Sequence, residues 1–466
     1  MDGNTTHVSL CRPGSEPWLA AELRAAGATP LSAQAAVPGS GTGWLAWQPA
    51  AQPAAQPAAQ PAARPGSKLP GLTGKRAPIF ERQRMAGAVW LPGSDLDALA
   101  PQLTAAARQA LPRLGAPAAL ALHAFAPDPT GERSGSGRAA RLERLLRTAW
   151  NTAWSTARDV AAPPLLPMEP VRAEAQAAVW QVCLLECGVW WSLTPAAGLA
   201  DPYPGGVHRM ARAAGAPSRS VLKLEEALEV LGRAPRARER VIDLGAAPGG
   251  WSYACLQRGC RVLAVDNGPL KLAGLDALPG ELTHLRADGL RLRPPPGWLP
   301  ADWLLSDMLI APGVCLGLLR KWIEGGWMRR FVVNVKLPQR EPLAALAPLC
   351  DFLAGVPGLA WRMRQLYHDR REVTVLGGFT APRALREPRA AAQRPVPAPR
   401  TKPRAKPRGK PSAKARAKAR AVGRPAAGRP AAAPARGQRP APPRERRPNQ
   451  RPTQRPVRRR ARTRGA

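Results

Sequence analysis

The stretch from Arg240 to Trp251, RVIDLGAAPGGW, constrains the fold of this chain more than any other part of it. It predicts a short apolar strand that ends in a turn rich in glycine, alanine and proline and then opens a helix. A strand that feeds such a turn presents backbone N–H groups to a ligand at the carboxyl edge of a parallel sheet. The spacing is not G-x-G-x-x-G and Pro248 lies inside the turn, which disfavours an NAD-dependent oxidoreductase. The stretch therefore predicts an α/β domain with a ligand site at this turn.

Four further apolar segments follow at the intervals of an α/β domain, and each carries a polar residue near its end. They are 261–268, 282–289, 301–308 and 330–338, with Asp266, Asp288, Asp307 and Lys336 near their ends. Parallel strands present their carboxyl ends at one edge of an open sheet, so these side chains should gather near the turn. Asp266 lies 21 residues after Gly245, a distance at which an acid typically accepts hydrogen bonds from ribose hydroxyls. The pattern predicts a cofactor that contains a nucleoside.

The motifs DLGAAPGGW, VDNGP, RADG, SDM and NVKLP, preceded by SRSVLKLEEA and followed by QLYHDRREVTV, resemble the FtsJ-like ribose 2'-O-methyltransferases. The resemblance covers about residues 216–376, and within that family it is to the members that methylate a cytidine ribose of 23S rRNA. It implies a doubly wound, Rossmann-like domain over 196–380 that uses S-adenosyl-L-methionine as its cofactor. The partner would be 23S rRNA, naked or in a large-subunit precursor. A non-catalytic RNA-binding or ribosome-assembly factor that keeps the same fold is the alternative.

The resemblance also implies roles for the residues that match the family's motifs position by position. Lys223, Asp307, Lys336 and Glu372 match the family's catalytic Lys-Asp-Lys-Glu set. Lys336 would take the proton of the ribose hydroxyl, which requires burial or the nearby positive charge of Lys223 because an ordinary lysine is protonated at neutral pH. Contacts to the cofactor would come from Ser220, Ala247, Pro248, Gly249, Gly250, Asp266, Asp288 and Asp307. We interpret His368 and Asp369 as strand-end structure or an RNA contact and not as a catalytic dyad.

The region before this domain predicts two smaller folded units joined by a linker. Residues 1–49 predict a small α/β unit, and 50–66, a short Ala/Gln/Pro repeat, predicts a linker or inserted loop. Residues 67–195 alternate strand-like and helix-like segments, an α+β pattern that fits a ferredoxin-like or THUMP-like RNA-binding region. Trp150 and Trp154 lie on an amphipathic helix with a basic face and could stack on RNA bases, although Trp at this spacing more often packs in a core.

The formal net charge of the chain is +37, and most of it lies at the C-terminal end. Residues 380–466 hold 28 Lys and Arg against two Asp and Glu, with many prolines and few apolar side chains. Such a composition cannot bury a core, and a basic block of this kind holds polyanions through phosphate contacts. It predicts a disordered basic tail over 381–466 that binds RNA nonspecifically.

The seven cysteines form no CxxC pair and no Cys/His zinc spacing. An odd count without a disulfide framework favours a reducing compartment. No apolar run reaches the length of a membrane span, and the N-terminus lacks the positive-then-apolar order of a signal peptide. We therefore expect a cytoplasmic protein without a metal site and without a membrane partner.

Overall fold

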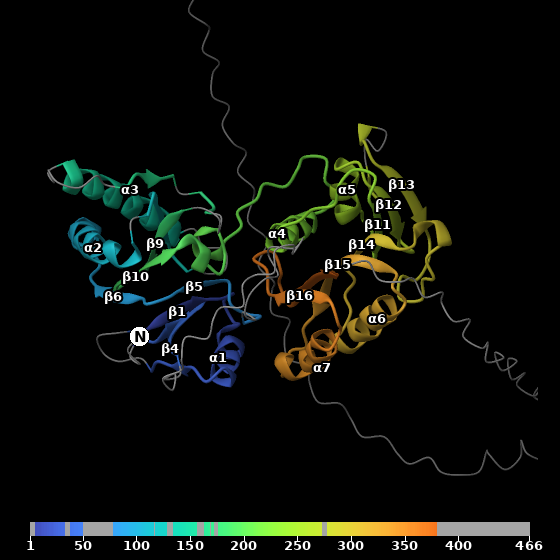
Figure 1. Cartoon of the computed structure of the whole chain (residues 1–466), viewed down its shortest axis with the longest axis horizontal. Helices are drawn as coiled ribbons and strands as arrows, with labels where there is room; N and C mark the ends of the chain where they lie inside the picture. The colour runs from blue at the N-terminus through green and yellow to red at the C-terminus, as the bar shows by residue number, and fades with distance from the viewer. Residues whose placement is uncertain are drawn as a thin grey trace, which may run out of the picture. The chain divides into compact units, whose positions relative to one another are not determined.

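The computed structural model in Figure 1 describes residues 5–32, 38–49, 78–115, 117–127, 134–155, 163–167, 169–171, 176–272 and 277–379. The chain divides into two compact units, 1–392 and 393–466, and all the described residues belong to the first. The expected linker over 50–66 and the expected tail over 381–466 lie outside the described residues.

A seven-stranded sheet forms the C-terminal part of the described chain, with the order β13-β12-β11-β14-β15-β17-β16. Its strands are β11 (Arg240–Leu244), β12 (Arg261–Val265), β13 (Glu281–Leu285), β14 (Ala301–Ser306), β15 (Met328–Lys336), β16 (Leu359–Arg364) and β17 (Glu372–Phe379). Strands β11 to β15 are parallel to one another, and β17 lies antiparallel between β15 and β16. The strand order reverses between β11 and β14, the place where doubly wound sheets bind ligands. The predicted doubly wound domain is confirmed.

Helices cover both faces of this sheet (Figure 1). They do so because successive residues of its central strands are apolar, so that apolar side chains point out of both faces and need to be buried. The helices are α4 (Val221–Leu231), α5 (Gly250–Gln257), α6 (Pro312–Glu324) and α7 (Pro342–Ala354). Val241 of β11 packs in the core that α4 and α5 share, and its neighbour Ile242 packs in the core that α6 and α7 share. The second of these cores also takes in Leu19 and Leu23 from the N-terminal region.

The first of two smaller sheets has the order β2-β4-β1-β5, with β3 paired to β4. Its elements are β1 (His7–Leu10), α1 (Glu16–Ala25), β2 (Thr29–Pro30), β3 (Ser40–Gly41), β4 (Trp44–Gln48) and β5 (Gln83–Met85). The small α/β unit expected over 1–49 is present, but it does not end there, because β5 pairs antiparallel with β1. Since β4 pairs with only one edge of β1, β5 satisfies the backbone groups of the other edge.

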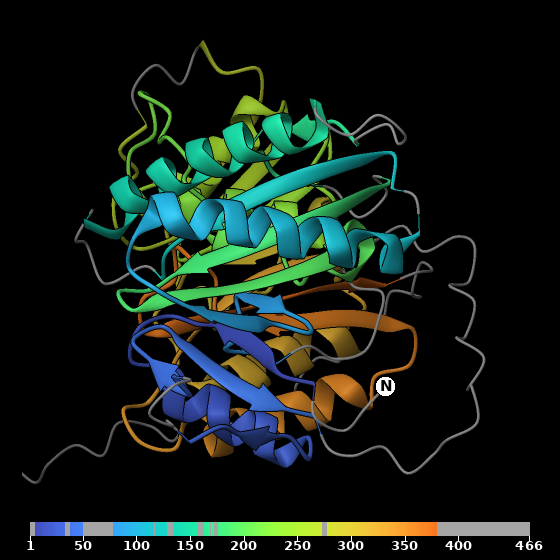
Figure 2. The ribbon, with the colours of Figure 1, turned by 90° about the vertical axis from the view of Figure 1, so that its left-hand side faces the viewer.

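The second small sheet has the order β6-β10-β9-β7-β8. Its elements are β6 (Val89–Pro92), α2 (Leu96–Ala110), β7 (Ala119–Phe125), α3 (Ser134–Ser155), β8 (Leu165–Leu166), β9 (Ala177–Leu184) and β10 (Gly188–Pro195). Figure 2 shows α2 and α3 side by side over one face of this sheet. A ferredoxin-like fold has the chain order β-α-β-β-α-β. The ferredoxin-like expectation is therefore wrong, because here two strand–helix units and β8 come first. The β9–β10 hairpin then lies between β6 and β7 in the middle of the sheet.

The tryptophans of the second small sheet and its helices pack in two cores, one of which also takes in residues of the first small sheet. Trp150 is 1 % exposed, and its ring centroid lies 5.8 Å from that of Trp180 and 5.7 Å from that of Trp154. Trp190 is also buried and lies 5.3 Å from Trp90. Aromatic pairs at these distances stabilise a core beyond the area that they bury. Core packing of Trp150, and not base stacking, is thus what the structure shows.

Candidate active site

In the turn between β11 and α5, glycines leave the backbone without side chains and close to other segments of the chain. Gly245 and Gly249 have φ values of +75° and +114°, where any side chain would be strained. A Cβ atom added to Gly250 would lie 2.5 Å from the hydroxyl oxygens of Ser218 and Ser220. Ser220, which precedes α4, therefore lies directly against the turn that the sequence motif predicted.

Asp266, at the end of β12, shapes this turn. Its Oδ2 accepts a hydrogen bond from the backbone N–H of Ala247 at 3.0 Å, and its Oδ1 accepts one from Gly268 at 2.7 Å. The backbone carbonyl of Pro248 accepts from the N–H of Lys271 at 2.8 Å, which holds the turn to the loop after β12. A carboxylate oxygen can accept more than one hydrogen bond. Asp266 can therefore hold the turn and still accept hydrogen bonds from a ligand.

Asp288 lies in the loop after the outermost strand, β13, and is exposed. Its Oδ1 accepts a hydrogen bond from the N–H of Leu290 at 2.9 Å, and its Oδ2 lies 3.5 Å from Nε of Arg291. Both contacts are local to this loop. The structure thus places Asp288 at the predicted edge of the sheet, with a smaller part in shaping the turn than Asp266 has.

Asp243 is a buried carboxyl group at the start of the turn. Its Oδ2 accepts a hydrogen bond from the hydroxyl of Ser252 at 2.7 Å, while its Oδ1 is buried without a hydrogen-bond partner among the described residues. Burial raises the pKa of Asp243 to about 7, against the opposing effect of the Ser252 hydrogen bond. A spare buried acceptor, a bare backbone turn and an acid after β12 together fit a ligand with an amino group and ribose hydroxyls, as S-adenosyl-L-methionine has.

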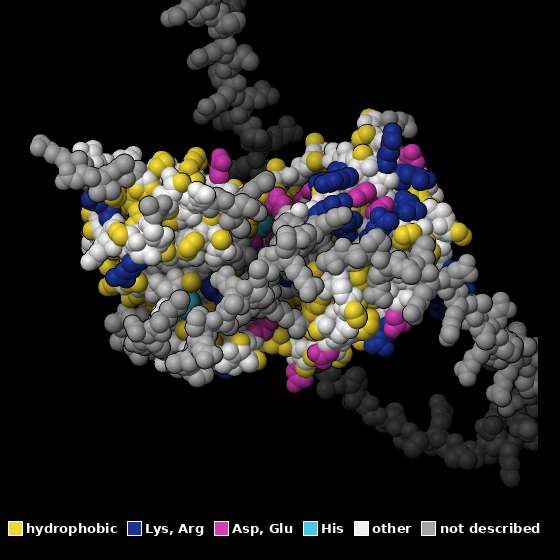
Figure 3. Space-filling view, in the orientation of Figure 1, with side chains coloured by type: hydrophobic (Ala, Val, Ile, Leu, Met, Phe, Trp, Pro, Cys, Tyr) yellow, Lys and Arg dark blue, Asp and Glu magenta, His cyan; other side chains and the backbone are white. Residues whose placement is uncertain are grey.

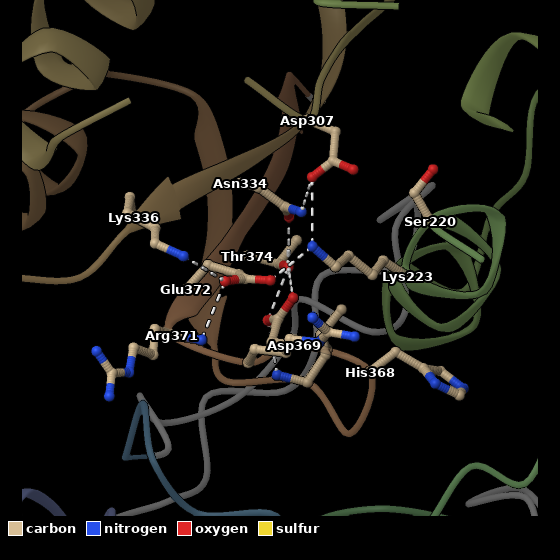
Figure 4. A network of polar contacts seen from close by, with 12 residues as sticks. Ser220, Lys223, Asp307, Asn334, Lys336, His368, Asp369, Arg371, Glu372 and Thr374 are labelled. Carbon is tan, nitrogen blue, oxygen red and sulfur yellow. Dashed lines mark hydrogen bonds and ion pairs between the residues drawn. The ribbon is translucent and has the colours of Figure 1, made fainter. Parts of the chain in front are cut away.

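The four predicted catalytic residues meet at the neighbouring part of the same edge (Figure 4). Lys336 and Glu372 are opposite each other in the antiparallel register of β15 and β17. Glu372 Oε1 accepts a hydrogen bond from Nζ of Lys223 on α4 at 2.6 Å, and Glu372 Oε2 lies 3.4 Å from Nζ of Lys336. Nζ of Lys223 also lies 3.4 Å from Oδ1 of Asp307, which follows β14. One carboxylate thus holds two amines.

The two amines differ in burial and in charge environment. The side chain of Lys223 is 16 % exposed and that of Lys336 is 41 % exposed. Burial alone would lower the pKa of Lys223, but the charges of Asp307 and Glu372 outweigh it and raise that pKa above its ordinary value. Burial would raise the pKa of Glu372, but the hydrogen bond and charge of Lys223 lower it. Lys223 and Glu372 are therefore a charged pair, and Lys336 is the more exposed of the two amines.

Sequence reasoning missed two polar residues of this cluster, Asn334 and Thr374. Nδ2 of Asn334 donates a hydrogen bond to Oδ1 of Asp307 at 2.6 Å, and the hydroxyl of Thr374 donates one to Oδ1 of Asn334 at 2.8 Å. The two residues are partners in the ladder of β15 and β17. Their signal in the sequence is the strand period of two, which places Asn334 on the same face as Lys336.

His368 and Asp369 do not form a dyad. In Figure 4 the ring of His368 points away from Asp369 and from the charged cluster. Asp369 is fully buried, accepts a hydrogen bond from the N–H of Leu366 at 2.9 Å, and has its Oδ2 3.0 Å from the hydroxyl oxygen of Thr374. Its backbone carbonyl accepts a hydrogen bond from Nη1 of Arg12 at 2.6 Å. The interpretation of this pair as strand-end structure agrees with these contacts.

The seven cysteines of the chain are free, and all of them lie among the described residues. Within the described ranges, no group of three or more His, Cys, Asp and Glu side chains is placed to hold a metal ion. Across that same part of the chain, the longest and most apolar helices fall short of a membrane span.

Comparison with known proteins finds similarity in the part of the chain that holds this site. Residues 216–317 match the family model described as FtsJ-like methyltransferase. Curated relatives named Ribosomal RNA large subunit methyltransferase M are 44 % identical over 190 residues in Alkalilimnicola ehrlichii and 43 % identical over 185 residues in Laribacter hongkongensis. These matches cover 39 % and 37 % of this chain and 51 % of each relative. The chain thus spans about half the length of the curated relatives it matches.

Among solved structures, a "possible methylase" from Clostridium difficile 630 is 11 % identical, with a TM-score of 0.30 over 82 % of this chain and 100 % of that chain. Magnesium protoporphyrin IX methyltransferase from Synechocystis PCC 6803, with bound SAM, is 17 % identical, with a TM-score of 0.25 over 35 % of this chain and 79 % of that chain. The family match and the curated relatives confirm the resemblance that the motifs indicated. The part of this chain that matches the FtsJ-like methyltransferase model, residues 216–317, holds the glycine-rich turn together with Lys223 and Asp307, and the structure places Lys336 and Glu372 beside them at one edge of the seven-stranded sheet.

Proposed function

We propose that this chain uses S-adenosyl-L-methionine to methylate a ribose 2'-oxygen of 23S rRNA, at a cytidine, with Lys336 as general base. The observation that carries the proposal is the carboxylate of Glu372, which holds Lys223 at 2.6 Å and Lys336 at 3.4 Å. The curated relatives, named for methylation of large-subunit ribosomal RNA, support the substrate class.

The chemistry asks three things of the protein. A ribose 2'-hydroxyl is a poor nucleophile, so its oxygen must be aligned with the methyl group, its proton must be taken and water must be kept out. Lys336 suits the second task, because its contact with Glu372 is the longer of the two and its side chain is the more exposed. Glu372 and Lys223 then orient Lys336 towards the substrate.

The residues of the turn would hold the cofactor. Ser220, the turn 247–250, Asp266 and Asp288 line the edge where the family binds it, and Asp243 offers a buried oxygen for its amino group. When bound, the cofactor supplies a methyl group on a positively charged sulfur, which needs no metal to react. Asp307 belongs to both sets, because it follows β14 beside the turn and contacts Lys223.

Binding of the RNA is assigned to three parts of the chain. The region 67–195 takes the place of a THUMP-like RNA-binding module, and the basic residues of 381–466 add phosphate contacts that do not read sequence. Figure 3 shows Lys and Arg side chains gathered on the methyltransferase domain over α5, β12 and β13. Exposed arginines on these strands and the loop after them are Arg261, Arg286, Arg291 and Arg293.

Methyl transfer to rRNA tests the proposal directly. The full chain would be incubated with methyl-labelled S-adenosyl-L-methionine and with 23S rRNA, naked or in large-subunit precursors, from cells that lack this gene. We expect one ribose to become methylated, and mapping of alkali-resistant bonds would locate it. RNA binding without any methyl incorporation into either substrate would contradict the proposal and favour the non-catalytic assembly factor.

A further inference from the structure

A line of hydrogen bonds leads from a buried carboxyl group to the carboxylate of Asp307 (Figure 4). It begins at Asp369, whose Oδ2 lies 3.0 Å from the hydroxyl oxygen of Thr374. The hydroxyl lies 2.8 Å from Oδ1 of Asn334, and Nδ2 of Asn334 lies 2.6 Å from Oδ1 of Asp307. Asp369 and Thr374 are fully buried and Asn334 is nearly so. Because Asn334 and Thr374 are partners in the ladder of β15 and β17, the sheet itself sets the spacing of this line.

The number of hydrogens along the line determines which group donates to which. The amide of Asn334 must present its NH₂ group to Asp307, since the reversed amide would set two oxygens 2.6 Å apart. Its carbonyl oxygen then faces Thr374 and needs a hydrogen from that hydroxyl. A threonine hydroxyl has one hydrogen, so once it donates to Asn334 it can only accept from Asp369. A carboxylate has no hydrogen to give, and a neutral carboxyl group has one.

The surroundings of Asp369 agree with a neutral carboxyl group. Burial raises the pKa of Asp369 well above its ordinary value, and the charges of Glu226 and Glu372 add to this effect. The hydrogen bond from the N–H of Leu366 and the charge of Lys223 oppose it. The N–H of Leu366 donates to Oδ2, and both oxygens of Asp369 lie near the hydroxyl oxygen of Thr374, Oδ2 at 3.0 Å and Oδ1 at 3.3 Å, so a hydrogen on this carboxyl group would face that hydroxyl.

We propose that Asp369 is a neutral carboxylic acid in the folded protein and that Asp369, Thr374 and Asn334 are positioning residues, which hold the carboxylate of Asp307 beside Lys223. The proposal rests on the proposed function, in which Asp307 belongs to the catalytic set. None of the three touches the reacting atoms, so their removal should lower kcat through Asp307 and leave the KM for RNA nearly unchanged. This assigns to Asp369 a role that its place beside His368 does not suggest.

Matched pairs of variants separate hydrogen bonding from packing. Thr374→Val keeps the shape of the side chain and removes the hydroxyl, and should lower kcat roughly tenfold, the effect of one lost hydrogen bond. Thr374→Ser keeps the hydroxyl and should restore most of kcat. Asp369→Asn can still accept from Leu366 and donate to Thr374, so it should lose far less than Asp369→Leu. Equal losses in Asp369→Asn and Asp369→Leu would overturn the neutral carboxyl group.

A control variant reports the cost of removing a buried threonine hydroxyl elsewhere. Thr104 of α2 is buried, and its hydroxyl donates to the carbonyl of Ala100 at 2.8 Å. Thr104→Val should change the melting temperature as Thr374→Val does, while kcat at saturating RNA stays at the wild-type value, because a change in the RNA-binding region would act on the KM for RNA. Cofactor affinity, measured by isothermal titration on every variant, should fall much less than kcat does, because Asp307 is only one of several expected cofactor contacts and none of these hydrogen bonds reaches the glycine-rich turn. A fall of kcat in Thr104→Val equal to that in Thr374→Val would reduce the effect to stability and contradict the positioning role.

A pH profile gives a readout that a purely structural role would not move. Burial raises the pKa of Asp307, and Lys223 and the hydrogen bond from Asn334 oppose that shift. Asn334→Ala should therefore raise the pKa of Asp307 further and move the acid limb of kcat to higher pH. The charged groups that face Asp307 are Lys223 of α4, Glu372 of β17 and Asp243 of β11, and all three remain in this variant. An acid limb that stays in place would contradict the proposal.

Infrared spectroscopy tests the neutral carboxyl group without any RNA. Difference spectra between the wild-type protein and Asp369→Asn, with ¹³C-labelled aspartate, should contain the carbonyl band of a protonated carboxyl group at pH 7 and at pH 8. Absence of the band would overturn the proposal even if the enzyme methylates RNA. If the band is present and the wild-type protein methylates no RNA, the proposed function fails while the protonation of Asp369 stands.

Discussion

The glycine-rich turn and the charged cluster share one edge of the sheet, but they are built in different ways. The turn is continuous in sequence from Gly245 to Gly250, and the acid that shapes it, Asp266, comes one helix and one strand later. The cluster draws its side chains from α4, from the end of β14 and from the β15–β17 ladder. Backbone conformation makes the first, and side-chain pairing across distant segments makes the second. Cofactor affinity and catalysis should therefore respond to different substitutions.

The largest expected effect separates the cluster from the turn. Lys336→Ala and Lys336→Arg should lower methyl transfer by about 10²- to 10⁴-fold, the usual contribution of a general base. Arginine keeps the charge but cannot accept the proton. Affinity for S-adenosyl-L-methionine, measured by isothermal titration, should stay near the wild-type value in both variants, while a labelled-methyl assay records the loss. Substantial transfer by Lys336→Arg would remove Lys336 from the role of base.

The second expected effect is a loss of cofactor affinity with little loss of kcat, and it comes from a change at the turn. Asp266→Ala removes the acceptor of the N–H groups of Ala247 and Gly268, and should weaken cofactor binding by about 1–3 kcal/mol. At saturating cofactor, kcat should fall much less than in Lys336→Ala, because the cluster stays intact. Isothermal titration and saturation kinetics measure the two quantities. Wild-type protein should bind NAD poorly, and tight NAD binding would contradict the cofactor assignment.

A third, smaller effect concerns the buried contacts that hold α4, the helix that carries Lys223 to the cluster. The buried ring of His208 lies 3.0 Å from Oδ1 of Asp201 and 3.2 Å from Oε2 of Glu229, which belongs to the same helix as Lys223. Arg364 of β16 lies 2.8 Å from the other oxygen of Asp201. Burial would lower the pKa of His208, but the charge of Asp201 outweighs it and raises that pKa to about 9, above the ordinary value of 6.5.

His208→Gln should therefore lower the free energy of unfolding by about 1–3 kcal/mol. Because the pKa is higher in the folded state, this stabilisation is fully present below pH 6.5 and is lost as the pH rises through about 9. Thermal unfolding of wild type and variant from pH 6 to pH 10 measures it, and the gap in melting temperature should close at the alkaline end. Cofactor affinity should stay unchanged. A gap that is constant across this range would mean that the ring is not charged in the folded protein.

The smallest expected effect at the site comes from removing the basic tail, which should change neither cofactor affinity nor the choice of nucleotide. A chain that ends near Pro382 lacks all 28 basic residues that follow Phe379, and should bind RNA more weakly, most of all at low salt. The slope of log affinity against log salt should become shallower by roughly 0.7–0.9 for each phosphate that the tail would have neutralised. The methylated nucleotide and the cofactor affinity should remain those of the full chain. An unchanged salt slope, or methylation redirected to another nucleotide, would contradict a nonspecific role.

Much of the fold could be predicted because its signals are local. Each buried parallel strand is a short apolar run, and each is followed by a polar residue at the ligand edge. The β9–β10 hairpin was likewise predictable from two apolar runs separated by a short turn. The position of β5 was not, because three residues, Gln83–Met85, carry too little pattern to show that they complete the edge of β1. The same limit explains why a ferredoxin-like order looked acceptable for the second sheet.

By itself, the sequence determined the doubly wound domain and its glycine-rich turn, because motif spacing and strand endings depend on neighbouring residues alone. The four charged residues were identified by the resemblance of their motifs to those of a known family. Only the tertiary structure decided which of these charged side chains contact one another. The ladder of β15 and β17 sets Lys336 opposite Glu372 and Asn334 opposite Thr374, and the packing of α4 brings Lys223 to within 2.6 Å of the same carboxylate. Hydrogen bonds between segments so far apart in the chain depend on register and burial, which no local pattern encodes.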